Sequence, residues 1–464
     1  MRSVLAVASN TVKQALRMKI ALVFIVLLLV LLPVMALSSS GDGTPKGRLQ
    51  TFVSYGLSLT SFLLCLLTIF TAIHTTTSDI VHRQVYTVLT KPIRRYQYLL
   101  GKFAGILFLD LGLLVGFSAA IYAVTVLAPG FMKVSESQWV DLHDQFFTAR
   151  ARIPAQPQPV SEEAVEAEYA RLQQNQTLDQ YFQGASVKRI KDWIRKRMRM
   201  ENNVVAPGGQ LLWEFDRVRL ADPNDRLFVR FKFDTASATS SDEQILGQWM
   251  VGDVRPLREG KRPNGPIYSA DRRDAVRTSH EFAVPGDAIA KDGYLSVAFH
   301  NPPTNNTAVF FDFEGDAEDE EQTLVVMYKA GTFLGNYLRG VTVIFFRLVF
   351  LAGMALAGST FLSFPVAVLL SLVVFFTVSI SGFILDSFTY LGEAMEKVYG
   401  MSIEPIIKGL PQFDKYNPSA YLVDGRLLDW TLFHWASWTL VWALVLLGLG
   451  LWIFSHKELA RDTS

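Results

Sequence analysis

Six apolar runs, each close to the length that crosses a lipid bilayer, constrain this chain more than any other feature. A hydrocarbon core of about 30 Å needs roughly 20 residues of helix. Because backbone groups in lipid must bond within their own segment, each run is expected to be helical. We therefore predict an α-helical polytopic membrane protein with six transmembrane helices. These cover residues 20–37, 52–73, 103–127, 341–362, 366–385 and 432–454.

Lys and Arg residues gather in two of the segments that flank these runs. Four precede the first run without an acidic residue, and five lie in the segment 79–102, where Asp79 is the one acid. The connector 387–430 is rich in acids instead. Since short cytoplasmic loops carry the excess of positive residues, we predict that both termini and the segment 79–102 face the cytoplasm. The protein is expected to be a multi-pass protein of the cell (inner) membrane, with the connector 387–430 outside.

The first residues predict a helix that lies along the membrane. Leu5, Val12 and Leu16 fall near one face of a helix over residues 2–18, and Lys13 and Arg17 lie off that face. This pattern is typical of an amphipathic interfacial helix, here assigned to 1–19. A cleaved signal peptide is the alternative, but the stretch before the first apolar run is long and patterned for that purpose.

The insert between the third and fourth runs changes its pattern near residue 208. Residues 129–207 predict a helical segment with helices at 161–174 and about 187–200. Across 208–332 short alternating stretches are separated by Gly, Pro, Asn and Asp, which is typical of an antiparallel β-sandwich. The predicted extracytoplasmic insert is thus an α+β domain. Its clearest strands are 211–215, 227–233, 295–299, 309–313 and 324–328, and 245–251 is less regular.

The remaining boundaries follow from these segments. The first three transmembrane helices fall in 20–128, the last three in 333–455, and 456–464 forms a cytoplasmic tail. Cys65, the only cysteine, lies in the second apolar run, so no disulfide is expected within the chain.

The predicted helix 187–200 allows two interpretations. Its basic residues surround the apolar positions Val187, Ile190, Ile194 and Met198. Such a helix could lie on anionic lipid or bind an acidic cargo. The simpler interpretation, which we prefer, packs the apolar stripe on the sandwich and leaves the charges in water.

A search for catalytic motifs finds none. The sequence has no phosphate-binding loop, no H-E-x-x-H, no G-x-S-x-G and no Cys/His cluster. Asp141, His143 and Asp144 could supply metal ligands, but a polar surface turn explains them more simply. The acidic stretch 314–321 lacks the spacing of an EF-hand. We predict no catalytic residue, cofactor, metal site or nucleic-acid partner in this chain.

Two ionisable residues lie inside apolar runs, Asp110 in the third and Arg347 in the fourth. Charged groups at such positions are costly and face a bundle interior, an interface or a water-filled cavity. Three roles remain open from the sequence: a pairing with each other or across a dimer, a role in transport, or, for Arg347, a side chain that reaches to the membrane surface.

The segment 79–102 is more elaborate than a loop that only sets topology. Its apolar residues form a stripe on a predicted short helix, with Asp79, His82 and Arg83 left for a partner and a break at Lys91-Pro92. A surface helix with an apolar stripe fits a groove on another protein. The residues expected to make that contact are Asp79, Ile80, Val81, His82, Arg83, Val85, Tyr86, Leu89, Pro92 and Arg95.

At these residues the chain resembles the permease subunits of ABC-2 type transporters, and among them the branch named for a permease of multicopper-enzyme maturation. The resemblance covers about 1–128 and 335–464 and leaves out the insert. The motif at 85–95 is moderately specific, and the other motifs are informative because they occur in the order found in the family. The matching motifs are VYTVLTKPIRR (85–95) after Asp79, LLGK (99–102), STFLSFPV (359–366), LPQFD (410–414), LVDGR (422–426) and FSHKEL (454–459).

The resemblance implies a function for the segment. Residues 79–90 would form the coupling helix that sits in a cleft of a cytoplasmic ATPase subunit, which binds ATP and Mg²⁺. A homodimer or pair of permeases with two ATPase subunits would make the working unit, an exporter of unknown substrate. Many relatives carry Gly-Thr where this chain has Arg83-Gln84. The alternative is a membrane-anchored binding or assembly protein whose sandwich holds a ligand or partner without transport.

Overall fold

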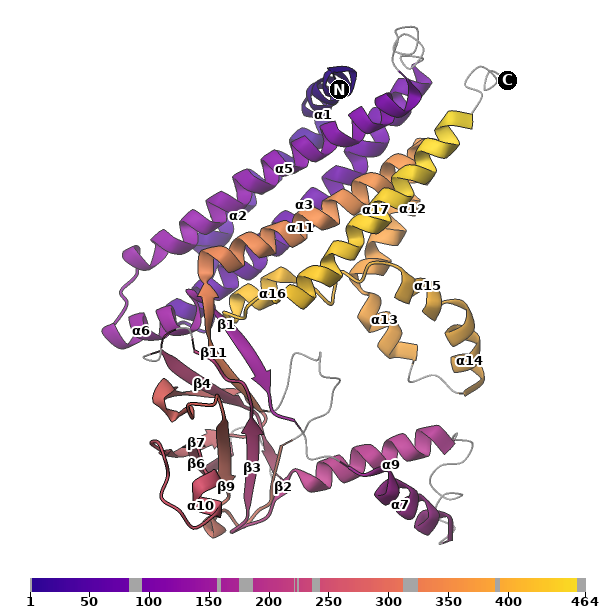
Figure 1. Cartoon of the computed structure of the whole chain (residues 1–464). Helices are drawn as coiled ribbons and strands as arrows, with labels where there is room; N and C mark the ends of the chain where they lie inside the picture. The colour runs from indigo at the N-terminus through magenta and orange to yellow at the C-terminus, as the bar shows by residue number, and fades with distance from the viewer. Residues whose placement is uncertain are drawn as a thin grey trace. The chain divides into compact units, whose positions relative to one another are not determined.

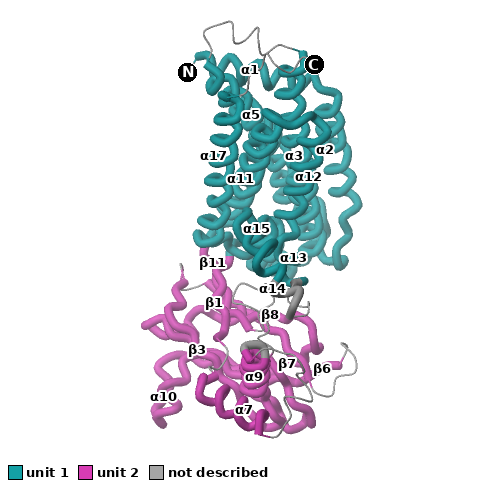
Figure 2. The backbone as a smooth tube through the Cα atoms, turned by 90° about the vertical axis from the view of Figure 1, so that its right-hand side faces the viewer, with its two compact units in different colours: residues 1–149, 331–464 teal, residues 150–330 magenta. Residues whose placement is uncertain are grey.

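The computed structural model describes residues 2–82, 94–156, 160–174, 187–220, 222, 225–235, 243–311, 324–388 and 393–456. The chain divides into two compact units, coloured teal and magenta in Figure 2. The helical unit consists of 1–149 and 331–464, and the β unit of 150–330. Each unit has a hydrophobic core of its own.

The helical unit contains five described helices long and apolar enough to cross a membrane. They are α2 (Lys19–Ser38), α3 (Pro45–Val81), α5 (Arg95–Leu127, continued by the 3-10 turn η1 at Ala128–Phe131), α11 (Phe333–Ser359) and α17 (Trp430–His456). The shorter helices are α1 (Arg2–Leu16), α6 (Glu136–Gln145), α12 (Phe364–Ser379), α13 (Ser381–Phe388), α14 (Glu393–Ser402), α15 (Glu404–Gly409) and α16 (Pro418–Val423). These long apolar helices are compatible with a protein that spans a membrane.

The predicted fifth span over 366–385 is not one continuous helix. Helix α12 ends at Ser379, and α13 continues at an angle of 68°. Asp414 holds this break open, because its carboxylate accepts hydrogen bonds from Ser381 Oγ (2.6 Å) and from the amide of Gly382. The described part of the helical unit therefore has five unbroken candidate spans, or six if the bent pair of α12 and α13 counts as one span.

Helices α3 and α11 form the centre of the helical unit (Figure 1). Their apolar windows are 72% and 78% buried, against 17–28% in α2, α5 and α17, which form its outside. Helix α17 approaches α11 closely where small residues meet. A Cβ atom added at Gly353 would lie 2.9 Å from Ala443 O, and one added at Gly450 would lie 2.8 Å from Ala357 Cα. Small residues of this kind let helices pack in lipid.

The β unit is built on two four-stranded sheets with orders β1-β11-β4-β8 and β3-β9-β6-β7, and on a small sheet β2-β10-β5. The strands are β1 (Thr148–Pro154), β2 (Val204–Val205), β3 (Gln210–Phe215), β4 (Arg226–Phe231), β5 (Asp234–Thr235), β6 (Gln244–Gly252), β7 (Tyr268–Ala275), β8 (His280–Pro285), β9 (Leu295–His300), β10 (Val309–Phe310) and β11 (Leu324–Thr332). Short helical turns lie at α10 (Arg255–Arg258), η2 (Gly286–Ala288) and η3 (Pro303–Asn305).

Both four-stranded sheets bury one face in a single core, which is the arrangement of a β-sandwich. The pairs β4–β8, β4–β11, β3–β9, β6–β9 and β6–β7 are antiparallel, with Trp249 opposite Phe299 in the register. Trp249 lies 4.9 Å from the Phe299 ring and 4.3 Å from the Phe231 ring of the facing sheet. Aromatic side chains from both sheets thus fill the space between them. The strands β1, β2, β5, β7 and β8 were not predicted.

The two predicted helices of the insert are confirmed as α7 (Glu162–Gln174) and α9 (Val187–Asn202). The apolar stripe of α9 packs on α7, where Ile190 and Ile194 bury against Val165. Arg195 adds an ion pair to Glu162 at 3.0 Å. The expectation that the stripe packs on the sandwich is therefore wrong. Its two central residues, Ile190 and Ile194, are buried against α7, whereas Val187 is 51% exposed.

Candidate functional site

The end of α3, the start of α5 and the helix α1 meet at one end of the helical unit (Figure 1). Five of the predicted contact residues lie outside the described residues: Arg83, Val85, Tyr86, Leu89 and Pro92. Of the described ones, Arg95 begins α5 and the other four lie at the end of α3. Ile80 and Val81 form its last turn and His82 its C-cap, with Val81 66% exposed.

Asp79 lies in a buried polar network and not on the surface. The Lys102 Nζ is 2.7 Å from Asp79 Oδ2, and Tyr98 OH donates a hydrogen bond of 2.7 Å to the same oxygen. Gln14 Nε2 donates to Asp79 Oδ1 at 3.1 Å. The prediction that Asp79 remains open for a partner is therefore wrong, because three side chains from α1 and α5 occupy its oxygens.

The Lys102 ammonium also has all of its hydrogen bonds satisfied within this network. The Lys102 side chain is 1% exposed, and its ammonium also donates to Gln14 Oε1 (2.9 Å) and Thr75 O (3.1 Å). An ammonium has three N–H donors, and each of them has an acceptor here. Buried charges are tolerated when they are paired and their remaining hydrogen bonds are made. The network thus joins α1, α3 and α5 at a single point.

Glycines of α5 bring α1 close to this network. A Cβ atom at Gly101 would lie 2.6 Å from Val7 Cβ, and one at Gly105 would lie 2.6 Å from Ala8 O. The face of α1 that packs on α5 is accordingly made of Val7, Ala8, Thr11 and Ala15. Two of the three apolar residues named from the sequence do not belong to this packed face, since Leu5 is 58% and Leu16 48% exposed.

Arg95, another predicted contact residue, joins the start of α5 to the end of α17. Its Nη1 donates to Phe454 O (3.1 Å) and Ser455 O (2.8 Å), and Tyr98 stacks on Phe454 at 5.9 Å. A cation next to the last carbonyl groups of a helix is favourable, because those groups carry partial negative charge. The segment 83–93 is thus flanked by residues that contact four helices.

Asp110 and Arg347 do not form an ion pair within the described part of the chain. Asp110 is fully buried and accepts a hydrogen bond from Thr68 Oγ1 at 2.9 Å. The Nη2 of Arg347 donates to Phe413 O (2.7 Å) and Tyr416 O (2.6 Å), in the connector before α16. The possibility that the two residues neutralise each other is therefore excluded in this structure.

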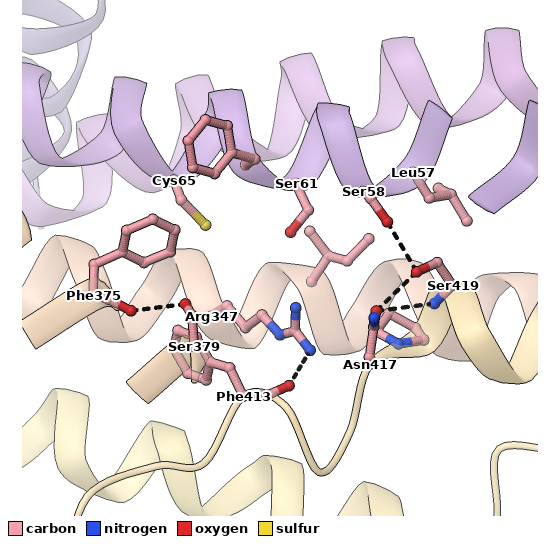
Figure 3. Close-up of a pocket in the computed structure, with 13 residues that line it drawn as sticks. Leu57, Ser58, Ser61, Cys65, Arg347, Phe375, Ser379, Phe413, Asn417 and Ser419 are labelled. Carbon is pink, nitrogen blue, oxygen red and sulfur yellow. Dashed lines mark hydrogen bonds between the residues drawn. The ribbon is translucent and has the colours of Figure 1, made fainter. Parts of the chain in front are cut away.

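A cavity of about 160 Å³ lies next to Arg347, between α3, α11, α12 and the connector (Figure 3). Ser58, Ser61 and Cys65 line it from α3, and Ser379 lines it at the end of α12. This cavity was not predicted from the sequence. The spacing of the three α3 residues, which places small polar groups on one face of an apolar helix, could have indicated it.

No group of three or more His, Cys, Asp or Glu side chains able to hold a metal ion is found within the described ranges. Asp141, His143 and Asp144 lie on α6, where the His143 ring stacks on Trp139 at 5.7 Å. The acidic stretch 314–321 is outside the described residues.

A scan of family models and searches of curated proteins and solved structures find no match to this chain.

Proposed function

We propose that this chain is the permease subunit of an ABC-2 type transporter, an exporter that couples ATP hydrolysis by a separate ATPase chain to movement or extraction of a substrate. The observation that carries the proposal is the buried network of Asp79, Lys102, Tyr98 and Gln14. It holds both ends of the segment 83–93 on the body of the protein. Two copies of this chain and two ATPase subunits would form the working unit.

The network gives the segment a mechanical connection to the helices. A force on residues 83–93 acts on α3 through Asp79 and on α5 through Lys102 and Arg95. Helix α3 runs unbroken for 37 residues, about 55 Å. It packs along its length against α11, α5 and α12. Movement at one end of α3 is therefore transmitted to the centre of the helical unit and to the cavity beside Arg347.

The proposed orientation agrees with the arrangement of the chain ends. Helix α1 and the last turn of α17 lie at the same end of the helical unit as the end of α3 and the start of α5, as the bonds of Gln14 and Arg95 require (Figure 1). We assign this end to the cytoplasm, where the ATPase is, because the segment 79–102 carries the excess of Lys and Arg.

Site-directed cross-linking tests the proposal. In a Cys65→Ser background, His82→Cys places the only thiol at the exposed C-cap of α3. We expect it to cross-link to an ATPase subunit that co-purifies with the chain. Tyr55→Cys is the matched control, since Tyr55 is 63% exposed on the same helix but more than six turns away. The proposal fails when no ATPase co-purifies or when both thiols cross-link equally.

Charged substitutions test the coupling itself. Val85→Asp with Leu89→Asp is expected to leave ATP hydrolysis by the complex but to abolish its coupling to transport, because an apolar contact with the ATPase would be lost. Hydrolysis and transport are measured on the same reconstituted sample. Coupling that persists in the double variant would contradict a docking role for this segment.

One observation favours the alternative of a binding or assembly protein without transport. The β unit, 150–330, closes a core of its own, and a separate domain of this kind can hold a ligand or partner. Absence of an ATPase together with capture of a partner by the β unit would favour this alternative.

A further inference from the structure

Asp110 is the one acidic residue of α5, and its carboxyl group lies against α3. The side chain is fully buried, and Thr68 of α3 is its hydrogen-bond partner at 2.9 Å. The other carboxyl oxygen, Oδ1, is buried without a hydrogen-bond partner. An ionised carboxylate has two oxygens that accept hydrogen bonds, and its burial is costly when donors for them are lacking. The surroundings of Asp110 therefore suit an ionised group poorly.

The hydroxyl group of Thr68 makes two short contacts but carries a single proton. Its Oγ1 lies 2.8 Å from Leu64 O and 2.9 Å from Asp110 Oδ2. Both distances are those of full O–H···O hydrogen bonds, so each contact needs a proton of its own. A carbonyl oxygen cannot donate. When the Thr68 hydroxyl group donates to Leu64 O, the proton of the second bond must therefore come from Asp110.

Two other buried threonines on the same two helices indicate where the Thr68 proton goes. Thr75 of α3 donates to Thr71 O at 2.8 Å, and Thr125 of α5 donates to Ile121 O at 2.7 Å. In both cases the acceptor is the carbonyl group four residues earlier, which is a usual partner of a threonine within a helix. Leu64 O stands in the same relation to Thr68. This pattern assigns the hydroxyl proton to Leu64 O and leaves Thr68 Oγ1 as an acceptor for Asp110.

No cation pairs with Asp110 within the described part of the chain. Lys102, about two turns away on α5, pairs with Asp79 at 2.7 Å. Arg339 and Arg347 of α11 donate to carbonyl groups of the connector. Of the other helices packed on α5, α1 and α2 have exposed Lys and Arg side chains, α3 has Lys and Arg side chains bonded to other groups, and α17 has two exposed histidines. A negative charge on Asp110 would therefore lack a close counter-charge.

Two titratable groups of α3 and a bound metal ion do not change this conclusion. Cys65 interacts electrostatically with Asp110, but a thiol is neutral at neutral pH and does not compensate a carboxylate. His74 packs its ring on Phe364 of α12. A hard metal ion typically binds about six oxygen ligands or more. The hydrogen bonds here bring together the oxygens of Asp110, Thr68 and Leu64, which is a poor set for such an ion.

We propose that Asp110 is a proton-binding site, at which the carboxyl group is the neutral acid at neutral pH and donates a hydrogen bond to Thr68 Oγ1. The ligand is a proton, and the site lies in the contact between α3 and α5, the two helices that the segment 83–93 joins. Acids inside the helices of membrane proteins mark proton pathways. The proposal requires neither an ATPase nor a particular substrate, so it stands independently of the proposed function.

Infrared spectroscopy detects the proton on the full chain, purified in a detergent without ester groups and freed of lipid. The C=O stretching band of a carboxylic acid lies apart from the bands of ionised carboxylates and of amide groups. At neutral pH we expect the wild type to show such a band and Asp110→Asn to lose it. Asp79→Asn is the matched control, because Asp79 is also buried but pairs with Lys102. This control should leave the acid band unchanged.

Variants of Thr68 test the hydrogen bond and leave the acid itself in place. Thr68→Val removes the acceptor, so the acid band should persist but shift to higher frequency, as for a carboxylic acid that has lost its hydrogen bond. Thr68→Ser keeps the hydroxyl group and should keep the band at its wild-type position. If Asp110→Asn does not fold, these two variants decide. The proposal is overturned if folded Asp110→Asn has the same acid band as the wild type, or if Thr68→Val and Thr68→Ser give the same spectrum in this region.

Discussion

Replacing Asp79 by Asn removes the negative charge that faces the buried ammonium of Lys102. The ammonium would keep its bonds to Gln14 Oε1 and Thr75 O but would lack a counter-ion. The converse change, Lys102→Met, leaves the Asp79 carboxylate with the donors Tyr98 and Gln14 alone. Both single variants therefore strand a charge in the interior.

The structure allows the size of the effect to be bounded. The side chains are 1% and 8% exposed, so water screens the pair little. Removal of one partner of a buried pair costs about 3–5 kcal/mol, so each single variant is expected to lower the free energy of unfolding by about 3 kcal/mol. Removal of both charges is often close to neutral. The double variant Asp79→Asn/Lys102→Met is thus expected to cost much less than the sum, with a coupling energy of about 2 kcal/mol or more.

The measurement is unfolding of the purified chain in mixed micelles, followed by far-UV circular dichroism as the denaturing detergent is increased. Lys408→Met serves as the control, because Lys408 is 60% exposed and pairs with Glu404 one helical turn away. Exposed pairs of this kind contribute less than about 1 kcal/mol. If the losses in free energy of unfolding of the two single variants simply add in the double variant, the network does not act as a unit and the reasoning is refuted.

Two further changes test other contacts. Arg255 donates hydrogen bonds to Asp253 and Asp292 and thereby holds the pKa of both carboxyl groups below the ordinary value. The stabilisation is present above the ordinary carboxyl pKa of about 4 and is lost as the pH falls through the lowered pKa values. The midpoint of thermal unfolding between pH 6 and 2 should therefore depend less on pH in Arg255→Gln than in the wild type or in the control Arg262→Gln. An equal pH dependence in all three proteins would contradict the assignment. Gly105→Ala should lower stability by about 1–3 kcal/mol, because its Cβ would press on Ala8 O of α1, whereas Gly112→Ala meets nothing within 4 Å and should be neutral or slightly stabilising. Unfolding in mixed micelles compares the two glycine variants. Equal changes in the free energy of unfolding would show that α1 can shift away from the added Cβ atom at residue 105.

The positions of the long helices could be predicted from apolar run length, since lipid leaves few alternatives to a helix. The break after Ser379 could not. The run 366–385 is apolar throughout, and the groups that end the helix, Asp414 and the Phe413 amide, come from more than 30 residues further along the chain. Hydropathy measures composition within a window, so it does not detect a partner that arrives from outside that window.

In the β unit, too, some strands could be predicted from the sequence and others could not. Strands with alternating apolar residues were predicted, whereas β1 and β7, which lie at the edges of their sheets, were missed. The β7 sequence YSADRRDA has almost no apolar face, because one side of an edge strand is free to be polar. Its place is determined by β6, with Trp249 opposite Ala270.

For the candidate site, the sequence indicated which segment matters but not how its charges are used. Asp79 was expected to face a partner because it does not belong to the apolar stripe of the predicted short helix. Asp79 near the end of α3 and Lys102 in the second turn of α5 are opposite charges on the two helices that residues 83–93 join, and this could have suggested a pair. The contribution of Gln14 could not be foreseen, since it depends on how closely Gly101 and Gly105 admit α1.

The chain leaves the helical unit along β1 and returns along β11, and these two strands are neighbours in one sheet. A Cβ atom at Gly331 would lie 3.4 Å from Ala149 Cβ, so the points of exit and entry nearly touch. A short bridge between them could replace the whole intervening module without stretching the helices that it joins. The same geometry lets a module of this kind be gained, lost or exchanged during evolution while the helices keep their packing.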